Sequence, residues 1–294
     1  MADAIPTPVL VAREAMATRF EFALHGANRA VLRAAAEEAL DEVERIENQL
    51  SLFRPHTDVA RINAGAGLGP VRVAPEVFGL IRRAMQLSNA TEGAFDITAG
   101  AWMRAWGFHE ADSEDASVPT AVLCGASLLE LDSAALTVRF TQPGMRLDLG
   151  ALGKGYALDR AADLLREAGV LSALLHGGTS SIVAIGQPPD SPVWKVALAT
   201  GEAAELREES LSVSATWGRT REVGGIRRGH VMDPRSGEPV PGPRMAAVAC
   251  PLAADSDALS TALLVLGSDG RDTILQAMPA ARVWFSAIDT GEDA

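Results

Sequence analysis

Asp257 and Thr261 are four residues apart in a segment, 255–266, whose apolar residues predict a helix. Residues at this spacing share a helix face, so a carboxylate and a hydroxyl could meet one hard cation there. Oxygen ligands of this kind suit Mg²⁺. A simpler role uses the same residue types, with Asp255 or Asp257 capping the helix N-terminus and Thr261 on the surface. Spacing alone leaves both interpretations open.

A second segment, 146–156, places three glycines and a lysine between a short predicted strand and a predicted helix. Backbone N–H groups in such a turn can approach phosphate oxygens, and the helix N-terminus adds a favourable partial positive charge. The segment is not a P-loop, because its glycine spacing is one residue short and Gly155 takes the place of the metal-binding Ser or Thr. Lys154 is one of only two lysines, which favours a compact charge for a phosphate. The alternative is a solvated lysine beside a turn capped by Asp148.

Two histidine segments carry weaker signals. In 230–237, Asp-Pro and Ser-Gly are turn signals, and His230 ends a short predicted strand. His230 could orient or deprotonate a nucleophile, or it could be a structural histidine. The segment 176–181 begins with His176 and lies between two predicted strands, where it is either a ligand loop or a simple turn.

The elements that must position these segments are helices and strands in irregular order. Helices are predicted over 28–50 with Asn28 as N-cap, from Pro75, from about Tyr156, and over 255–266. The first helix should bury Val31, Ala35, Ala39, Val43, Ile46 and Leu50. Apolar and β-branched clusters predict strands at 136–140, 173–175, 182–185, 193–198, 245–249 and 282–287. Because strands and helices do not alternate regularly, we expect an α+β fold with mixed sheets.

Two other segments are predicted to lack regular structure. The glycines of 63–69 predict a loop, since their spacing is not that of a dinucleotide fingerprint and no strand precedes them. The acidic stretch 110–119 predicts a solvent-facing insertion.

The composition excludes several classes of protein. A net charge of −12 argues against nucleic acid or an anionic membrane as the main partner, because both require clustered Lys and Arg. Cys124 and Cys250 have no metal-type spacing and are expected to be buried thiols. No run of about 20 apolar residues could span a bilayer. We find no signal peptide and expect a soluble cytoplasmic protein, or a periplasmic or membrane-anchored one if the N-terminus was trimmed.

Taken in order, short motifs along the chain resemble the ApbE family, the FAD:protein FMN transferases. They are MATRF at 16–20, LSLFRP at 50–55, GAFDIT at 93–98 with WGF at 106–108, DLGALGKGYA at 148–157, HVMDPRSG at 230–237 and DALSTA at 257–262. The resemblance covers most of the chain, 16–267. It implies an N-terminal tail at 1–13 and one ApbE-like, T-fold-related domain of mixed sheets and packed helices at 14–290.

The resemblance also implies a set of site residues. FAD contacts map onto Met16, Phe53, Ala94, Phe95, Asp96, Asp148, Lys154 and the strand around Val231. Ligands for Mg²⁺ map onto the carbonyl of Ala151 and the side chains of Asp257 and Thr261. The chain departs from the family pattern at Phe53, where a tyrosine is expected, at Thr179, where many members are acidic, and at His176. Contacts of the 176–181 loop are therefore in doubt.

The implied reaction joins FMN from FAD to a threonine or serine hydroxyl of an acceptor protein, and AMP leaves. Phosphoryl transfer needs positioning and charge neutralisation more than covalent catalysis. Mg²⁺ would bridge diphosphate oxygens, Lys154 would offset charge, and His230 or Asp257 would act as the base. Two alternatives stay open: an FAD diphosphatase that releases FMN and AMP, and an FAD-binding protein without catalysis.

Overall fold

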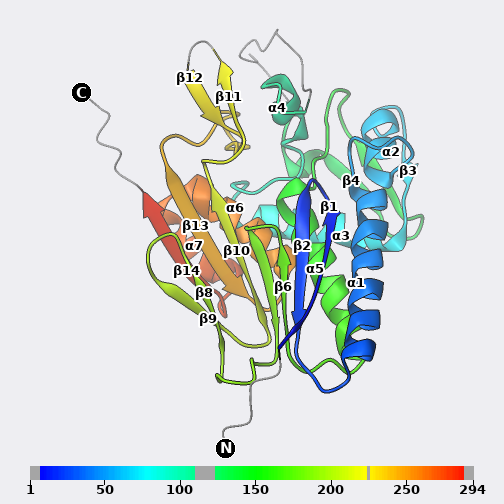
Figure 1. The fold of residues 1–294 in the computed structure, drawn as a ribbon. Coiled ribbons are helices and arrows are strands. Elements are labelled where there is room, and N and C mark those ends of the chain that lie inside the picture. The colour runs from blue at the N-terminus through cyan, green and yellow to red at the C-terminus, as the bar shows by residue number, and fades with distance from the viewer. Residues whose placement is uncertain (1–6, 110–122, 224–225, 288–294) are drawn as a thin grey trace, which may run out of the picture.

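The computed structural model describes residues 7–109, 123–223 and 226–287. Its centre is a seven-stranded sheet with the strand order β1-β2-β6-β7-β10-β13-β14 (Figure 1). Those strands are β1 (Val9–Ala15), β2 (Thr18–Leu24), β6 (Ala173–Gly177), β7 (Ser181–Ile185), β10 (Glu209–Ala215), β13 (Arg244–Cys250) and β14 (Arg282–Ala287). Every neighbouring pair is antiparallel. The α+β fold expected from the sequence is confirmed.

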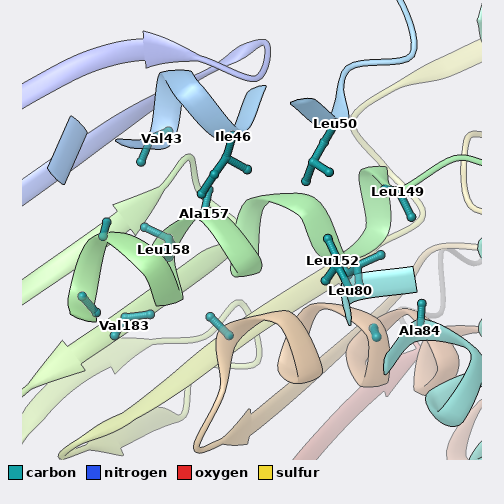
Figure 2. Close-up of a cluster of buried hydrophobic side chains, with 14 of the residues drawn as sticks. Val43, Ile46, Leu50, Leu80, Ala84, Leu149, Leu152, Ala157, Leu158 and Val183 are labelled. Carbon is teal, nitrogen blue, oxygen red and sulfur yellow. The ribbon is translucent and has the colours of Figure 1, made fainter. Parts of the chain in front are cut away.

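Three helices cover one face of this sheet and form the main core with it. They are α1 (Arg29–Leu50), α5 (Gly150–Glu167) and α6 (Ala253–Leu266). Figure 2 shows Ile46 of α1 against Ala157 of α5, with Val183 of β7 on the other side of α5. Helix α5 is therefore enclosed by α1, α6 and the sheet, which fixes the position of its N-terminus.

Strands β1 and β2 form the first hairpin, joined by Met16 and Ala17. Both turn residues have positive φ, 51° and 57°, as a two-residue type I′ turn requires. Strand β1 already begins at Val9, inside the stretch 1–13 that we expected to be a tail. That expectation is corrected for residues 9–13, because Val9 and Val11 alternate with exposed neighbours and pack into the core.

The first two predicted helices are confirmed. Asn28 caps α1, its side-chain oxygen accepting a hydrogen bond from Val31 N at 3.2 Å. The expected inward residues of α1 are buried except Val31, which is 52% exposed because it lies in the first turn, outside the packed stripe. Helix α3 (Pro75–Ala90) has Pro75 at its first position and buries its predicted apolar residues.

Helix α5 starts at Gly150, not near Tyr156, so the predicted glycine-rich turn is the first part of the helix. Its glycines allow close packing. A Cβ added to Gly155 would lie 2.1 Å from the carbonyl oxygen of Ala253 at the start of α6. Glycine is therefore required at position 155 by helix packing, which explains why no Ser or Thr stands there.

Helix α6 begins at Ala253 and is buried almost all round. Its N-cap, Leu252, provides no side-chain hydrogen bond. Asp159 of α5 takes that role, its two oxygens accepting from Ala253 N at 2.7 Å and Ala254 N at 2.9 Å. The interpretation of Asp255 or Asp257 as the cap is therefore wrong. Asp255 instead pairs with Arg83 through two hydrogen bonds of 2.9 and 2.7 Å.

Strand β10 was not predicted, and its composition explains why. The side chains facing α6 are Ser210, Ser212 and Ser214, which we call the serine row. The alternate residues Leu211 and Val213 pack on the opposite face of the sheet. A strand with a serine row toward the helices lacks the buried apolar alternation by which strands are recognised.

The opposite face of the sheet is covered in part by the hairpin of β8 (Trp194–Ala197) and β9 (Ala203–Leu206). A small sheet with the order β3-β5-β4 flanks the helices, formed by β3 (Val71–Arg72), β4 (Leu129–Asp132) and β5 (Thr137–Phe140). The six predicted strands correspond to β5, β6, β7, β8, β13 and β14, with ends that differ by up to two residues. Strands β1, β2, β3, β4, β9, β10 and β11 (Thr220–Val223) were missed, whereas β12 (Ile226–Gly229) is the short strand predicted before His230.

The predicted loop 63–69 is partly helical, because α2 (Asp58–Gly65) includes its first residues. Thr57 caps α2, and Asn63 uses both side-chain amide atoms to bond Leu147 N and O at 2.7 and 3.0 Å. A short helix with its cap outside the glycine run was not recognisable from the glycines. The predicted insertion 110–119 lies outside the described residues.

The two cysteines are free, as expected. Cys250 is fully buried, whereas Cys124 is only half-buried and contacts the Thr98 hydroxyl. Burial raises the pKa of each thiol to about 12, so neither is a reactive thiolate at neutral pH. Within the described ranges, no helix is both long and apolar enough to cross a bilayer.

Candidate active site

Asp257 is the centre of a buried polar cluster between α5, α6 and the sheet. Asp257 as a whole is 6% exposed. Oδ2 accepts a hydrogen bond from Gly155 N at 2.7 Å, and Oδ1 accepts from Ser181 Oγ at 2.7 Å and from Ser212 Oγ. These donors hold the carboxylate in one orientation, so its position is set before any ligand binds.

Thr261 lies one turn further along α6, on the same face as Asp257. Its hydroxyl donates to Asp257 O at 3.1 Å and lies 3.2 Å from Ser214 Oγ of the serine row. The predicted spacing therefore places both oxygen groups at one site. The simpler role of a surface threonine is wrong, because Thr261 is partly buried against β10.

Ala151 belongs to the same arrangement through the backbone. In an α-helix the carbonyl of Ala151 would accept from Gly155 N, four residues on. That N–H donates a hydrogen bond to the Asp257 carboxylate. A backbone carbonyl has two lone pairs, so the Ala151 oxygen keeps capacity for a further partner.

The three expected metal ligands form an all-oxygen donor set: a carboxylate, a hydroxyl and a backbone carbonyl. This set fits Mg²⁺, which is commonly bound by one or two carboxylates with substrate phosphates and water completing the octahedron. Among the described residues, no group of three or more His, Cys, Asp or Glu side chains could hold a metal alone. The donor set therefore fits a cation that is bound jointly by these protein oxygens and by an anionic substrate.

Asp148 precedes α5 and is tied in place from two sides. Oδ1 accepts from Gly150 N at 2.7 Å, which confirms the predicted turn cap. Oδ2 lies 2.8 Å from Nε2 of His109. Burial alone would raise the pKa of Asp148, but the hydrogen bond and charge of His109, the Gly150 N–H and the charge of Arg219 together lower it. Asp148 is therefore ionised at neutral pH.

Lys154 and His230 approach the same end of α5. Lys154 is half-buried, and within the described part of the chain no carboxylate forms an ion pair with it. His230 directly follows β12, and its Nδ1 lies 3.1 Å from the carbonyl oxygen of Arg219. Burial lowers the pKa of His230 most, the hydrogen bond to the Arg219 carbonyl and the charge of Asp148 oppose this, and the charges of Arg219 and Lys154 lower the pKa further. The neutral imidazole is favoured at neutral pH.

A pocket of about 770 Å³ opens beside these groups, at the end of the molecule where α4 (Gly100–Ala105) and the β11–β12 hairpin lie (Figure 1). It is lined by Phe53, Gly107, Phe108, His109, Gly218, Arg219, Thr220 and Arg221. Arg219 donates to the carbonyl of Phe108 at 2.9 Å, and Arg221 donates to that of Gly107. These bonds fasten the hairpin to the segment after α4 and form one wall of the pocket.

The remaining residues expected to bind FAD lie in different surroundings. Phe53 is 63% exposed at the pocket, and Met16 is half-buried at the tip of the β1–β2 hairpin. Val231 is half-buried but belongs to no strand, so the expected strand around it is corrected; only its carbonyl pairs, with Val240 N. The strand pairing of β12 already ends at Gly229, and the chain turns at the Asp-Pro that follows Met232.

The side chains of Ala94, Phe95 and Asp96 are buried. Asp96 accepts four hydrogen bonds from protein groups: Ser88 Oγ at 3.0 Å, Thr98 N at 2.8 Å, Thr98 Oγ1 at 2.6 Å and Ala126 N at 2.7 Å. The carboxylate therefore organises the turn after α3. The segment 176–181, expected to be a loop, is a loop only in part. His176 lies within β6, and only 178–180 form the turn to β7.

Comparison with known proteins agrees with this arrangement. The sequence profile of the ApbE family matches residues 16–285, which is most of the chain. The chain belongs to the ApbE family. Two of the motifs that indicated the resemblance contact each other, since Trp106 Nε1 donates to the carbonyl of Gly237 at 2.8 Å.

Two relatives in the ApbE family carry the name FAD:protein FMN transferase. The Klebsiella pneumoniae (strain 342) protein is 34% identical over 219 residues, covering 70% of this chain and 67% of the relative. The Rhodobacter capsulatus protein is 31% identical over 265 residues, covering 86% of this chain, and the chain spans about half of that relative's length, 50%. The apo structure of the Pseudomonas stutzeri flavinyl transferase ApbE has a TM-score of 0.82 and 26% identity, covering 98% of this chain and 94% of that one.

Several site residues were not found by sequence reasoning. His109 follows the WGF motif directly, but it lies between that motif and the acidic stretch and had no spacing signal. Ser181 and Ser212 contact Asp257 from two strands, and Asp159 caps α6 from another helix. The contacts of these residues join segments 30 to 100 positions apart in the chain, so no local pattern could have shown them.

Proposed function

We propose that this chain is an Mg²⁺-dependent FAD:protein FMN transferase, which moves FMN from FAD to a Thr or Ser hydroxyl of an acceptor protein and releases AMP. The observation that carries the proposal is the first turn of α5. There Lys154 is a half-buried cation, and its neighbour Gly155 donates to the Asp257 carboxylate. A cation and an oxygen-rich metal site one residue apart are what a diphosphate with bound Mg²⁺ requires. The names of the relatives support the same activity.

We assign Ala151, Asp257 and Thr261 to the metal, and Lys154 to the diphosphate. Mg²⁺ bound there would neutralise negative charge on the diphosphate as the bond to AMP breaks. Lys154 would offset part of that charge from the helix side. Met16, Phe53, Asp148 and Val231 would contact FAD, and 94–96 would do so only through the main chain because their side chains are buried.

The transfer forms one bond and breaks one. The acceptor hydroxyl oxygen bonds to the phosphorus of the FMN half, and the bond from that phosphorus to the bridging oxygen breaks. AMP leaves with the electron pair, and the hydroxyl proton passes to a base. Protein groups position the two reactants and stabilise charge, which supply most of the catalysis in phosphoryl transfer.

We assign the base to His230 rather than Asp257. The carbonyl of Arg219 accepts from Nδ1 of His230, so Nε2 of the neutral ring keeps its lone pair. Its lowered pKa keeps that form populated at neutral pH. Asp257 already accepts three hydrogen bonds, and it would lose its place as a metal ligand on taking a proton. The two roles are better divided between the two residues.

The decisive experiment incubates the protein with FAD and Mg²⁺, with and without a flavin-acceptor domain. A transferase consumes FAD only when the acceptor is present and increases the acceptor's mass by FMN. An FAD diphosphatase would release FMN and AMP without the acceptor, which chromatography separates. Bound FAD that is never consumed would identify a flavin-binding protein without catalysis. Either of the last two results would overturn the proposal.

A further inference from the structure

His109 is a site residue whose contacts reach both sides of the pocket. Its side chain is 4% exposed, and its Nε2 lies 2.8 Å from Oδ2 of Asp148. Its ring meets the ring of Phe53 edge to face, with centroids 6.0 Å apart. Both His109 and Phe53 line the pocket. One imidazole thus connects the exposed aromatic wall with the carboxylate in front of α5.

The chemistry of the contact fixes the proton on one nitrogen. Because an ionised carboxylate only accepts hydrogen bonds, Nε2 of His109 carries a proton and donates to Asp148. Among the described residues, no partner meets the buried Nδ1 of His109. A buried nitrogen without a partner opposes folding, so a residue chosen for stability alone would not be histidine.

The hydrogen bond from His109 restricts the orientation of the Asp148 carboxylate. Its second oxygen, Oδ1, accepts from Gly150 N at 2.7 Å, so the carboxylate is held between His109 and the first residue of α5. Without the imidazole, Asp148 would keep only the Gly150 bond and could rotate toward water, since its side chain is 19% exposed. The contact therefore fixes the orientation of the carboxylate beside His109, which lines the pocket.

We propose that His109 is a positioning residue for the flavin nucleotide, acting through Asp148. This inference rests on the proposed function, because it takes Asp148 as a contact of FAD. His109 orients the carboxylate so that it accepts a hydrogen bond from an O–H or N–H group of the nucleotide. Its role is in binding, and the phosphoryl chemistry belongs to the Lys154 and Asp257 side of α5.

Two substitutions separate the contacts of His109. His109→Gln keeps an amide N–H near the position of Nε2, so it retains the bond to Asp148 and loses the ring contact with Phe53. His109→Phe keeps the ring contact and loses the donor. The proposal predicts that FAD dissociation constants, measured by flavin fluorescence, stay near the wild-type value for His109→Gln. For His109→Phe they should rise about tenfold, the effect of losing a hydrogen bond to a charged group.

Turnover and stability complete the test. His109→Phe should raise KM for FAD by about the same factor while kcat stays within about twofold. Its melting temperature should stay close to that of the wild type, because removal of the unpartnered nitrogen offsets the lost hydrogen bond to Asp148. A purely structural histidine would instead give a lower melting temperature, with an apparent kcat that falls in proportion to lost protein and an unchanged KM. A loss of affinity for His109→Gln alone would assign the effect to the Phe53 contact. Equal losses for both variants would show that the donor to Asp148 does not decide the affinity, and either result would overturn the proposal.

Wild-type measurements keep this test apart from the function itself. If the wild-type chain binds no FAD, the proposed function fails before any variant is compared. If it binds FAD and His109→Phe binds equally well, the positioning role fails and the function stands. Riboflavin and ADP, used as separate ligands, show which half of FAD Asp148 contacts, because only that half should lose affinity in His109→Phe.

Discussion

Replacing Gly155 with alanine should separate α5 from α6 and disturb the candidate metal site. A Cβ at position 155 would lie 2.1 Å from Ala253 O, 2.3 Å from Ala253 C and 2.7 Å from Ala254 N. These are backbone atoms, so no side-chain rotation relieves the contact. The helices must move apart by about 0.9 Å before the shortest distance reaches 3.0 Å, below which such contacts essentially do not occur.

The cost of that movement follows from core packing. Added methyl groups in well-packed cores typically cost about 1–3 kcal/mol, and here they outweigh the helix propensity gained on replacing glycine. The free energy of unfolding should fall by about 2 kcal/mol. Because Gly155 N holds Asp257 at 2.7 Å, Mg²⁺-dependent turnover should fall by more than the loss of folded protein explains.

Gly153→Ala is the matched control, two residues away in the same helix. Its Cβ would meet only Leu50 Cδ1, at the ordinary contact distance of 3.7 Å. This variant should be as stable as the wild type or more stable by up to about 1 kcal/mol. Urea denaturation measures both variants. Equal stability of Gly155→Ala and Gly153→Ala would refute the close approach of α5 and α6 on which the site depends.

Two further predictions concern pH. Burial lowers the pKa of His230, so if His230 is the base, kcat/KM should be constant around neutral pH and decrease only below the ordinary histidine pKa of 6.5. His230→Gln should lower activity and remove this decrease at acidic pH. If the decrease remains unchanged in the variant, His230 is not the base. Burial raises the pKa of Asp159 from 3.8 to about 7, so the folded protein holds a proton that the unfolded chain releases between these values. The free energy of unfolding should therefore decrease as pH rises from 4 to 7, by at most about 4 kcal/mol, and Asp159→Asn should lose that slope in urea titrations at several pH values.

The sequence was sufficient where a contact depends on local spacing. Asp257 and Thr261 are one helical turn apart, so their common face followed from the helix period, and the structure brings both to one oxygen cluster. Asn28 and Pro75 marked helix starts because capping and N1 positions have their own residue preferences. These effects involve neighbours within four residues.

The sequence did not predict contacts between residues that are far apart in the chain. Helix α6 begins two residues before its first aspartate because Asp159, almost a hundred positions earlier, caps it. The glycines of α5 predicted a turn, but they serve close packing against α6, which only the folded chain shows. Strand β10 was missed because its serine row faces the Asp257 cluster in place of apolar residues. Polar contacts with α6 thus replaced the apolar alternation by which the strand would have been recognised.

The central claim is that the oxygen cluster of Asp257 and Thr261 holds the Mg²⁺ that transfer requires. The most direct test measures FMN attachment to an acceptor domain by intact mass, against Mg²⁺ concentration, for wild type and Asp257→Ala. FAD affinity and melting temperature are recorded beside it to confirm that the variant is folded. We predict Mg²⁺-dependent labelling by the wild type and none by a folded, FAD-binding Asp257→Ala at any Mg²⁺ concentration. Labelling by that variant with the wild-type Mg²⁺ dependence would contradict the account.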